Sequence, residues 1–417
     1  MASRIFGLII ISILLILIDI YIYKAIRSVS WKWKGQKHLL FAYIWWGYTF
    51  LLIAGVFVSI FFNIKFLLRS IILVVFFVTF VSKIFILPFL IADDLRRIAI
   101  WIKRKFNRKE ENTVNQENSI LRSEFLIKAG TLVAAIPLAS LSYGVVSSAY
   151  DYRVKRRTLY LPNLPKAFDG IKLGQLSDIH SGSFYDRKAV IGGVDMLLKE
   201  KPDMIFFTGD LVNNVATEMY EYQDIFSKVK APLGVFSVLG NHDYGDYHFG
   251  QGTSAAKIKN LADVKTTHKN MGWDLLVNEN RRLKIDGEEI AILGIENWGV
   301  GRFAKYGRMD LAIKDIDEVP IKLLLSHDPS HWRAQVLPEY PQIDAMFSGH
   351  THGMQFGLVT EKFQWSPAQY IYKEWAGLYK QGLQQLYVNV GYGFLGYPGR
   401  VGILPEITIF ELRRGDS

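Results

Sequence analysis

One stretch of the chain reads Met204-Ile205-Phe206-Phe207-Thr208-Gly209-Asp210, a short apolar run that ends in a glycine and a carboxylate. Short apolar runs bounded by turn residues predict buried strands. Five such runs are Ile171–Leu176, Met204–Phe207, Val235–Leu239, Ile321–Leu325 and Ile343–Phe347. Each is closely followed by polar side chains, in the segments Asp178-Ile179-His180, Gly209-Asp210, Gly240-Asn241-His242-Asp243, Ser326-His327-Asp328 and Gly349-His350-Thr351-His352-Gly353.

These polar segments carry side chains that bind metals. Because the carboxyl ends of neighbouring strands meet at one edge of a sheet, we expect the segments to converge on one site. Asp, Asn and His suit Mn, Zn or Fe better than Ca or Mg alone. The chain has no cysteine, which excludes thiolate-bound metals and disulfides. Seven candidate ligands exceed what one ion needs, which favours two metals about 3.5 to 4 Å apart that share a carboxylate and an activated water.

The positive charge of the chain is concentrated in its first part. Up to Arg157 there are 22 Lys and Arg against 8 Asp and Glu, whereas the rest has 27 against 31. A nucleic-acid-binding face needs basic residues where the substrate binds, and the C-terminal half does not supply them. We therefore expect no nucleic-acid partner.

The same first part is apolar enough to enter a membrane. At 1.5 Å per residue, three stretches are long enough to cross a hydrocarbon core of about 30 Å. They are Ile5–Tyr23, Leu39–Phe62 and Ser70–Ala92. A fourth stretch, Ala129–Ala149, is less apolar, and it either crosses the membrane or lies against it. The sequence thus predicts a membrane region over residues 1–150 with three or four transmembrane helices.

Charges between the spans predict their orientation. The first and third connections are basic, whereas the second carries only Lys65 and Arg69. By the positive-inside rule, the first and third connections are cytoplasmic, including a polar loop over residues 107–118. The N-terminus then lies outside, and a fourth span places everything after Tyr150 on the outer side.

Two ionisable residues, Asp19 and Lys83, fall within the predicted spans. Charged groups at such depth either serve a function, such as proton or ion conduction, or neutralise each other as a pair. The spans show no repeated polar pattern typical of a transporter.

From Thr158 onward, short strands alternate with the amphipathic stretches Arg187–Glu200 and Glu218–Lys228, which is typical of βαβ units. After Asn270 the pattern predicts successive strands at Leu275–Asn278, Arg281–Ile285 and Glu289–Gly294, with a hairpin turn at Asp286-Gly287. A second sheet packed on the first is the simplest consequence.

In order and in local sequence, the five polar segments resemble the calcineurin-like metallophosphoesterases, whose blocks run DxH, GD, GNHD/E, H and GHxH. The resemblance covers about Leu161–Leu412. Ser326–Pro329, Gly349–Gly353 and Arg400–Thr408 are similar to the membrane-attached bacterial branch of the YaeI/YkuE type. The resemblance implies an α/β fold. It is a four-layer α/β/β/α sandwich over residues 158–414, preceded by an all-α transmembrane region.

The resemblance also implies roles for single residues. Asp178, His180 and His352 would hold one metal, Asn241, His327 and His350 the other, and Asp210 would bridge them. His242 would donate a proton or hydrogen bond to the phosphoryl or leaving oxygen, with Asp243 orienting it. The glycines Gly209, Gly240 and Gly349 are expected to shape the loops without binding.

These expectations describe a multi-pass protein of the bacterial inner membrane with an extracytoplasmic catalytic domain and two divalent ions, Mn, Zn or Fe. Its reaction would be hydrolysis of a phosphoester or phosphodiester of a phospholipid or lipid-linked head group. The alternatives are a nucleotide pyrophosphohydrolase, a phosphoprotein phosphatase or a non-catalytic membrane sensor. Oligomeric state is not indicated.

Two local features bear on the substrate. Where the branch usually has a second glycine after GHxH, this chain has Met354, which we expect to narrow the entrance. Between Phe363 and Leu386, aromatic residues alternate with lysines, a composition that suits a membrane interface. The segment is either a lid that lies on the bilayer or an ordinary packing loop; its residues are Trp365, Tyr370, Tyr372, Trp375 and Tyr379, with Lys362, Lys373 and Lys380.

Overall fold

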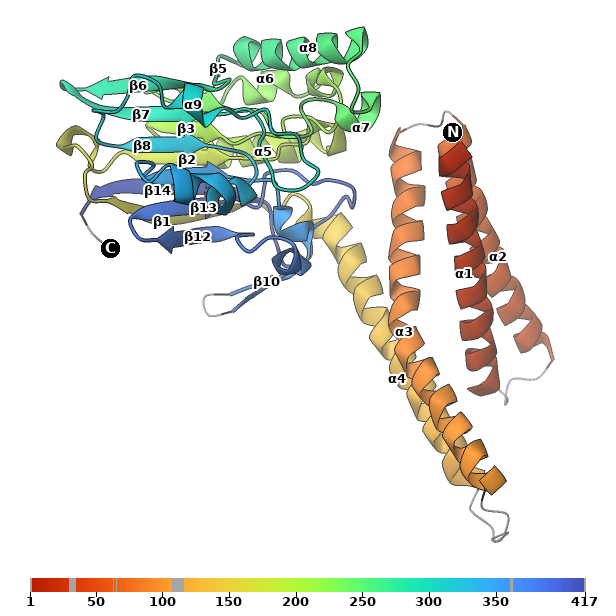
Figure 1. The fold of residues 1–417 in the computed structure, drawn as a ribbon. Helices are drawn as coiled ribbons and strands as arrows, with labels where there is room; N and C mark the ends of the chain where they lie inside the picture. Colours follow the sequence, from red (N-terminus) through yellow and green to blue (C-terminus); the bar gives the residue numbers. More distant parts are fainter. Residues whose placement is uncertain are drawn as a thin grey trace. The chain divides into compact units, whose positions relative to one another are not determined.

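The computed structural model describes residues 2–29, 35–62, 64, 66–106, 116–360 and 363–415. The chain divides into two compact units, Met1–Tyr143 and Gly144–Ser417 (Figure 1). Residues 107–115 of the predicted cytoplasmic loop lie outside the described residues, as do Lys65 and Lys362. Residues 116–118 of that predicted loop instead begin a helix.

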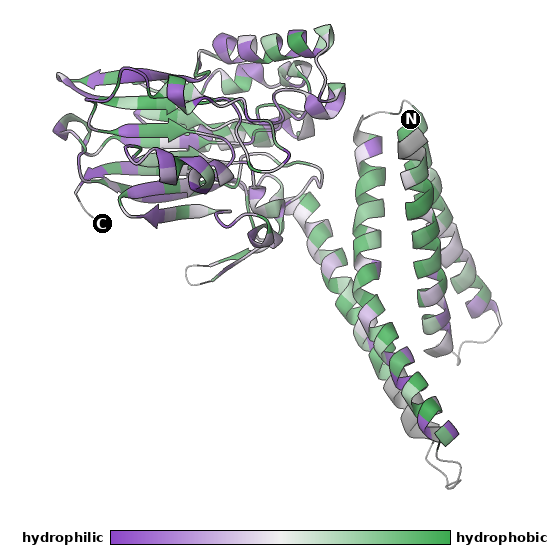
Figure 2. Cartoon of the chain, viewed as in Figure 1, coloured by the Kyte–Doolittle hydropathy of each residue, from purple (hydrophilic) through white to green (hydrophobic). Residues whose placement is uncertain are grey.

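The first unit is built of four long helices, α1 (Ala2–Val29), α2 (Gln36–Phe61), α3 (Phe66–Phe106) and α4 (Gln116–Tyr143). Figure 2 shows their predominantly hydrophobic residues. In the described part of the chain, four segments have the length and composition of a membrane span: Phe6–Ser28, Gln36–Phe61, Leu68–Lys103 and Glu124–Ser148. The fourth apolar stretch therefore meets the same criterion as the other three.

The two ionisable residues within the membrane helices contact each other. Lys83 Nζ of α3 lies 2.6 Å from Asp19 Oδ1 of α1, and Thr49 of α2 donates a hydrogen bond to Asp19 Oδ2 at 2.6 Å. Asp19 is fully buried. The pairing prediction is confirmed, and the pair joins three helices while neutralising two charges in an apolar environment.

The second unit contains two six-stranded sheets. The first has the order β1-β14-β2-β3-β4-β5 and consists of β1 (Arg153–Leu161), β14 (Glu406–Arg414), β2 (Lys172–Leu176), β3 (Met204–Phe207), β4 (Val235–Ser237) and β5 (Asp274–Leu275). The second has the order β12-β13-β9-β8-β7-β6 and consists of β12 (Gly377–Gln381), β13 (Gln384–Val388), β9 (Ala345–Ser348), β8 (Lys322–Leu325), β7 (Glu288–Gly294) and β6 (Glu279–Ile285). The predicted second sheet is confirmed.

Each of the five apolar runs contains a strand, namely β2, β3, β4, β8 and β9. Within their sheets, β2 to β5 are parallel to one another, and so are β7, β8 and β9. The hairpin between β6 and β7 turns at Asp286 and Gly287, whose φ angles are 50° and 84°. Two successive positive φ angles define the turn type that the Asp-Gly sequence predicts.

Aliphatic and aromatic side chains together fill the space between the sheets. Phe206 of β3 meets Phe347 of β9 edge to face at 5.1 Å between ring centroids, and Phe347 meets Phe410 of β14 at 5.3 Å. Residues of α5 (Arg187–Lys199), α6 (Gln223–Phe226) and α8 (Ala255–Met271) pack against the other face of the first sheet. Residues of α9 (Met309–Ala312) and of the π-helical turn Trp332–Val336 cover the second. The unit is a four-layer α/β/β/α sandwich.

A buried carboxylate ties β14 to β1. Glu406 is fully buried, and its Oε2 lies 2.5 Å from Lys155 Nζ. Tyr387 and Thr408 donate hydrogen bonds to its Oε1 at 2.6 and 2.7 Å. Burial raises the pKa of Glu406, but the Lys155 ammonium and these hydrogen bonds outweigh burial, so the pKa lies below its usual value.

We predict that Lys155→Met lowers the free energy of unfolding by about 2 kcal/mol at neutral pH, because it leaves a buried charge without its cation. A carboxyl group whose pKa is lowered in the folded protein stabilises the fold fully above its pKa in the unfolded chain, about 4.3 for Glu. That stabilisation is lost as the pH falls through the lower pKa of the folded state. The difference in the free energy of unfolding between variant and wild type should therefore shrink on acidification. Denaturation of the purified chain in detergent measures it, with the exposed Lys166→Met as control; a difference independent of pH would contradict this account.

Candidate metal centre

The five polar segments meet where their strands end. Asp178 and His180 follow β2, Asp210 follows β3, and Asn241 follows β4, while the remaining histidines follow β8 and β9 of the other sheet. Six of the seven predicted ligands form two groups, and within each group the ligand atoms lie within 4.8 Å of one another. The groups are Asp178, His180 and His352, and Asp210, His327 and His350.

Asp210 stands between the two groups. Its Oδ2 atom is 3.1 Å from His327 Nε2 in its own group and 3.5 Å from His180 Nε2 in the other. His180 Nε2 in turn lies 3.0 Å from His352 Nε2. One carboxylate oxygen is thus within reach of imidazoles from both sheets, which is the position that a bridging ligand needs.

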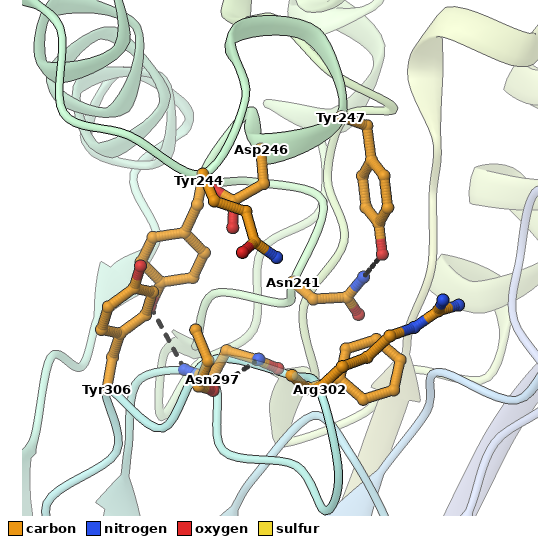
Figure 3. Close-up of a pocket in the computed structure, with 10 residues that line it drawn as sticks. Asn241, Tyr244, Asp246, Tyr247, Asn297, Arg302 and Tyr306 are labelled. Atoms are coloured by element: carbon orange, nitrogen blue, oxygen red, sulfur yellow. Dashed lines mark hydrogen bonds between the residues drawn. The ribbon is translucent and has the colours of Figure 1, made fainter. Parts of the chain in front are cut away.

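Asn241, the seventh predicted ligand, is nearly buried and has its amide oriented by a tyrosine. Its Nδ2 donates a hydrogen bond to the Tyr247 hydroxyl at 3.1 Å (Figure 3). Its Oδ1 is buried and has no hydrogen-bond partner within the described residues. A buried amide oxygen without a donor is costly, and a cation satisfies it. The residues present therefore fit a pair of divalent ions.

The backbone of the site is strained. Five of the seven predicted ligands have left-handed φ angles, a region that residues other than glycine seldom adopt. Each such residue costs about 1 to 3 kcal/mol and persists only where the surrounding structure enforces it. The five are Asp178 (50°), His180 (48°), Asp210 (58°), His350 (74°) and His352 (50°).

Two glycines make room for the carboxylates. A Cβ atom on Gly240 would lie 2.2 Å from Asp210 Oδ1, and one on Gly349 would lie 2.2 Å from Asp178 Oδ2. Such distances are impossible between non-bonded atoms, so a side chain at either position would displace a predicted ligand. The expectation that these glycines shape the loops agrees with this geometry.

Hydrogen bonds and charges set the protonation of the site. His327 Nδ1 lies 2.8 Å from the Thr208 carbonyl, which can only accept, so Nδ1 carries a proton and Nε2 faces Asp210. Burial lowers the pKa of His327, but the charge of Asp210 outweighs it and raises the pKa to about 10. Burial raises the pKa of Asp178, yet the neighbouring His352 holds it below its usual range. The negative field that favours a proton here also attracts divalent cations.

Two outer contacts were not predicted from the sequence. The Tyr372 hydroxyl lies 2.8 Å from His350 Nε2, on the far side of the ring from Nδ1, which faces His327 at 3.2 Å. Arg400 is fully buried, and its guanidinium lies 3.3 Å from His352 Nδ1. The sequence signals were present, since Tyr372 belongs to the aromatic segment and Arg400 to the C-terminal motif, but neither indicates a contact.

Asp243 does not hold His242 in the expected way. Its carboxylate accepts four backbone hydrogen bonds, from Gly240, Asp210, Leu211 and Val212, at 2.8 to 3.2 Å. His242 Nδ1 instead lies 2.7 Å from the Asn213 carbonyl, which fixes the proton on Nδ1 and leaves Nε2 available. Asp243 therefore shapes the loops around the site, and a backbone carbonyl orients His242.

The aromatic segment is packed at one part and exposed at another, and its predicted role as a lid on the bilayer stays a prediction. Trp375 is 5% exposed and packs in a small core. The Tyr379 hydroxyl accepts a hydrogen bond from the backbone N–H of Trp375 at 3.1 Å. Phe363, Tyr370 and Ile371 are instead 55%, 77% and 67% exposed.

Met354 adopts a left-handed φ of 49° and is 40% exposed. The conformation explains why glycine is usual at this position, since glycine adopts it without strain.

Comparison with known proteins identifies the family to which this chain belongs. A family model described as calcineurin-like phosphoesterase matches residues 171–354, and one described as probable calcineurin-like phosphoesterase, transmembrane domain, matches residues 3–149. The uncharacterized metallophosphoesterase YkuE of Bacillus subtilis is 30% identical over 292 residues, which are 68% of this chain and 94% of that protein. The chain belongs to the calcineurin-like metallophosphoesterases. It is a phosphoester hydrolase with a membrane domain.

Two further known proteins are similar to this chain. A transmembrane protein with metallophosphoesterase domain from Danio rerio is 28% identical, over 68% of this chain and 63% of that protein. The UDP-2,3-diacylglucosamine pyrophosphatase LpxG of Chlamydia trachomatis is 30% identical over 243 residues, which are 48% of this chain and 70% of that protein.

Tyr372→Phe should lower the affinity for divalent metal by about 10- to 100-fold, because the hydroxyl that fixes the orientation of His350 is lost. Metal titration of the purified chain measures the affinity. Tyr370→Phe makes the same chemical change on an exposed side chain nearby and should have no effect. Unchanged affinity in the Tyr372 variant would show that this hydroxyl does not support His350.

Proposed function

We propose that the protein hydrolyses a phosphoester or phosphodiester of a lipid or lipid-linked head group, using two divalent ions of the Mn, Zn or Fe type. The observation that carries the proposal is the position of Asp210 Oδ2 between imidazoles of both groups. The ions would be held by Asp178, His180, Asp210, Asn241, His327, His350 and His352.

When bound, the two ions would activate a water molecule and neutralise charge on the phosphoryl group. The residues of the chain supply the remaining requirements. His242, with its Nδ1 proton directed to the Asn213 carbonyl at 2.7 Å, keeps Nε2 for proton transfer to the leaving oxygen. Its ring stacks on Tyr247 at 4.4 Å and meets the edge of His180 at 5.0 Å. These contacts hold the imidazole beside the ligands.

Three observations support a lipid substrate. The same chain carries a membrane domain. The relative LpxG is named for a reaction on a diacylated sugar nucleotide. Within the catalytic unit, the exposed apolar residues Phe363 and Ile371 belong to the segment whose Tyr372 contacts His350. Exposed apolar side chains in a segment that contacts a metal ligand suit an enzyme that acts on a substrate held in a bilayer.

The experiment is a metal analysis combined with a substrate panel of liposome-embedded phosphoesters, soluble nucleotides and phosphopeptides. We expect bound divalent metal and the highest kcat/KM on the liposome substrates. Asp210→Asn should reduce both metal content and hydrolysis by more than about 100-fold, since it weakens the shared ligand of both ions. Asp224→Asn, on an exposed side chain, is the matched control. Preference for nucleotides or phosphopeptides would replace the lipid assignment, and wild-type activity of the Asp210 variant would refute the metal centre.

The same panel tests the exposed surface. Replacing Phe363 and Ile371 together by Ser should lower hydrolysis in liposomes by about 10-fold or more, because less apolar area enters the bilayer. Hydrolysis of a short-chain soluble analogue should not change. Leu383→Ser is the control, since Leu383 is 71% exposed but lies just before β13, at the end of that strand opposite the site. An equal loss on soluble and embedded substrates would argue against membrane contact.

We further propose that the catalytic unit lies on the extracytoplasmic side of a bacterial inner membrane, on the basis of the charges between the spans. Because the chain has no cysteine of its own, the labelling of a single introduced cysteine shows on which side of the membrane that residue lies. A membrane-impermeant maleimide applied to intact spheroplasts should label Asn163→Cys, whereas Lys103→Cys should react only after permeabilisation. The reverse pattern would place the catalytic unit in the cytoplasm.

A further inference from the structure

A cavity of about 210 Å³ adjoins the candidate metal centre and shares Asn241 with it (Figure 3). Residues around α7 (Asp246–Phe249) form one wall, and the loop after β7 forms the other. The volume is smaller than the roughly 300 to 1,000 Å³ of pockets for drug-sized ligands, so it suits a head group and not acyl chains. The lining residues are Asn241, Tyr244, Asp246, Tyr247, Gln251, Asn297, Arg302, Phe303, Ala304 and Tyr306.

One cation lines this cavity. Arg302 is exposed and has no acidic partner within the described ranges of the chain. The only carboxylate of the lining, Asp246, lies 2.6 Å from Lys257 Nζ, which compensates its charge. The cavity therefore presents an uncompensated positive charge beside the site that, under the proposed function, would hold a phosphoryl group.

The loop that carries Arg302 reaches the metal centre. Phe303, the next residue in the chain, meets the ring of His350 edge to face at 5.0 Å between ring centroids. Tyr247 lines the same cavity as Arg302 and contacts Asn241. Arg302 therefore lies beside the region in which the substrate phosphate would lie.

The cavity also contains an unpaired acceptor. Asn297 is 1% exposed, and its Oδ1 has no hydrogen-bond partner among the residues that the structure describes. Its Nδ2 donates a hydrogen bond to the Ala304 carbonyl at 3.3 Å. A carbonyl can only accept, so the amide nitrogen lies on this side and the oxygen on the other. This oxygen is free to accept a hydrogen bond from a hydroxyl or N–H group of a ligand in the cavity.

We propose that this cavity is a substrate subsite in which Arg302 binds a second phosphate, so that the preferred substrate is a diphosphate diester carrying a sugar or base. The inference rests on the proposed function and specifies its substrate class. In the reaction, the water oxygen would bond to the phosphorus that lies at the metal centre, and the bridging P–O bond would break. The electron pair of that bond would leave with the distal phosphate, giving two phosphomonoester dianions and releasing the two protons of the water. Arg302 then faces the charge that develops on the leaving phosphate.

The first test measures binding to the full chain in detergent with manganese. In calorimetry, Arg302→Gln should weaken the binding of methylenediphosphonate by about 10- to 100-fold, because a charge-assisted contact is lost. Orthophosphate binding should change by less than about 2-fold, since it occupies only the metal centre. Lys305→Gln is the matched control, because Lys305 lies in the same loop but over the Trp298 ring and outside the cavity lining. Equal effects on both anions, or no effect on either, would overturn the subsite.

The second test measures kcat/KM on UDP-2,3-diacylglucosamine in liposomes, UDP-N-acetylglucosamine in solution and bis(p-nitrophenyl) phosphate. Arg302→Gln should reduce hydrolysis of both diphosphates and spare the single phosphodiester; the two diphosphate substrates distinguish a lipid-held source from a soluble one. Wild-type activity on the phosphodiester without activity on either diphosphate would overturn the subsite and leave the proposed function intact. Inactivity of the metal-loaded wild type on every substrate would instead overturn the proposed function, whatever the calorimetry shows.

Discussion

The carboxylate of Asp210 is the contact on which the organisation of the catalytic unit depends. Its Oδ2 atom reaches His180, which follows a strand of one sheet, and His327, which follows a strand of the other. Neither sheet alone supplies a complete set of ligands. The sheets must therefore keep a fixed position relative to each other, and the hydrophobic core between them, which includes the contact of Phe206 with Phe347, provides that constraint.

This arrangement concentrates unfavourable conformational and electrostatic free energy at the metal centre. Most of the predicted ligands occupy left-handed backbone conformations, and the acidic and imidazole groups are buried together. Such strain persists only in a framework that is stable without it. The parallel strands, the four backbone bonds to Asp243 and the ion pair of Glu406 with Lys155 form that framework. The loops can be strained because the strands that carry them are not.

Much of this was predictable from the sequence, for a definite physical reason. Short apolar runs with polar residues at their ends encode both the strands and the side chains at their edge, so β3 and the position of Asp210 follow from local pattern alone. Contacts made across loops are not encoded in this way. Tyr372 on His350, Arg302 in the cavity and the Asn213 carbonyl on His242 depend on how distant segments fold back. The assumption that Asp243 orients its neighbour failed because its carboxylate is occupied by backbone N–H groups.

The hydroxyl of Tyr372 joins two properties that would otherwise be independent. It belongs to the segment with the exposed apolar residues, and it touches the ring nitrogen of His350 that faces away from the other ligands. By thermodynamic reciprocity, a lipid surface that shifts this segment alters how firmly the imidazole retains a cation, and a retained cation steadies the segment to the same extent. Under the proposed function, in which this segment meets the bilayer, occupancy of the metal centre and attachment of the segment to the lipid surface would be coupled in one equilibrium.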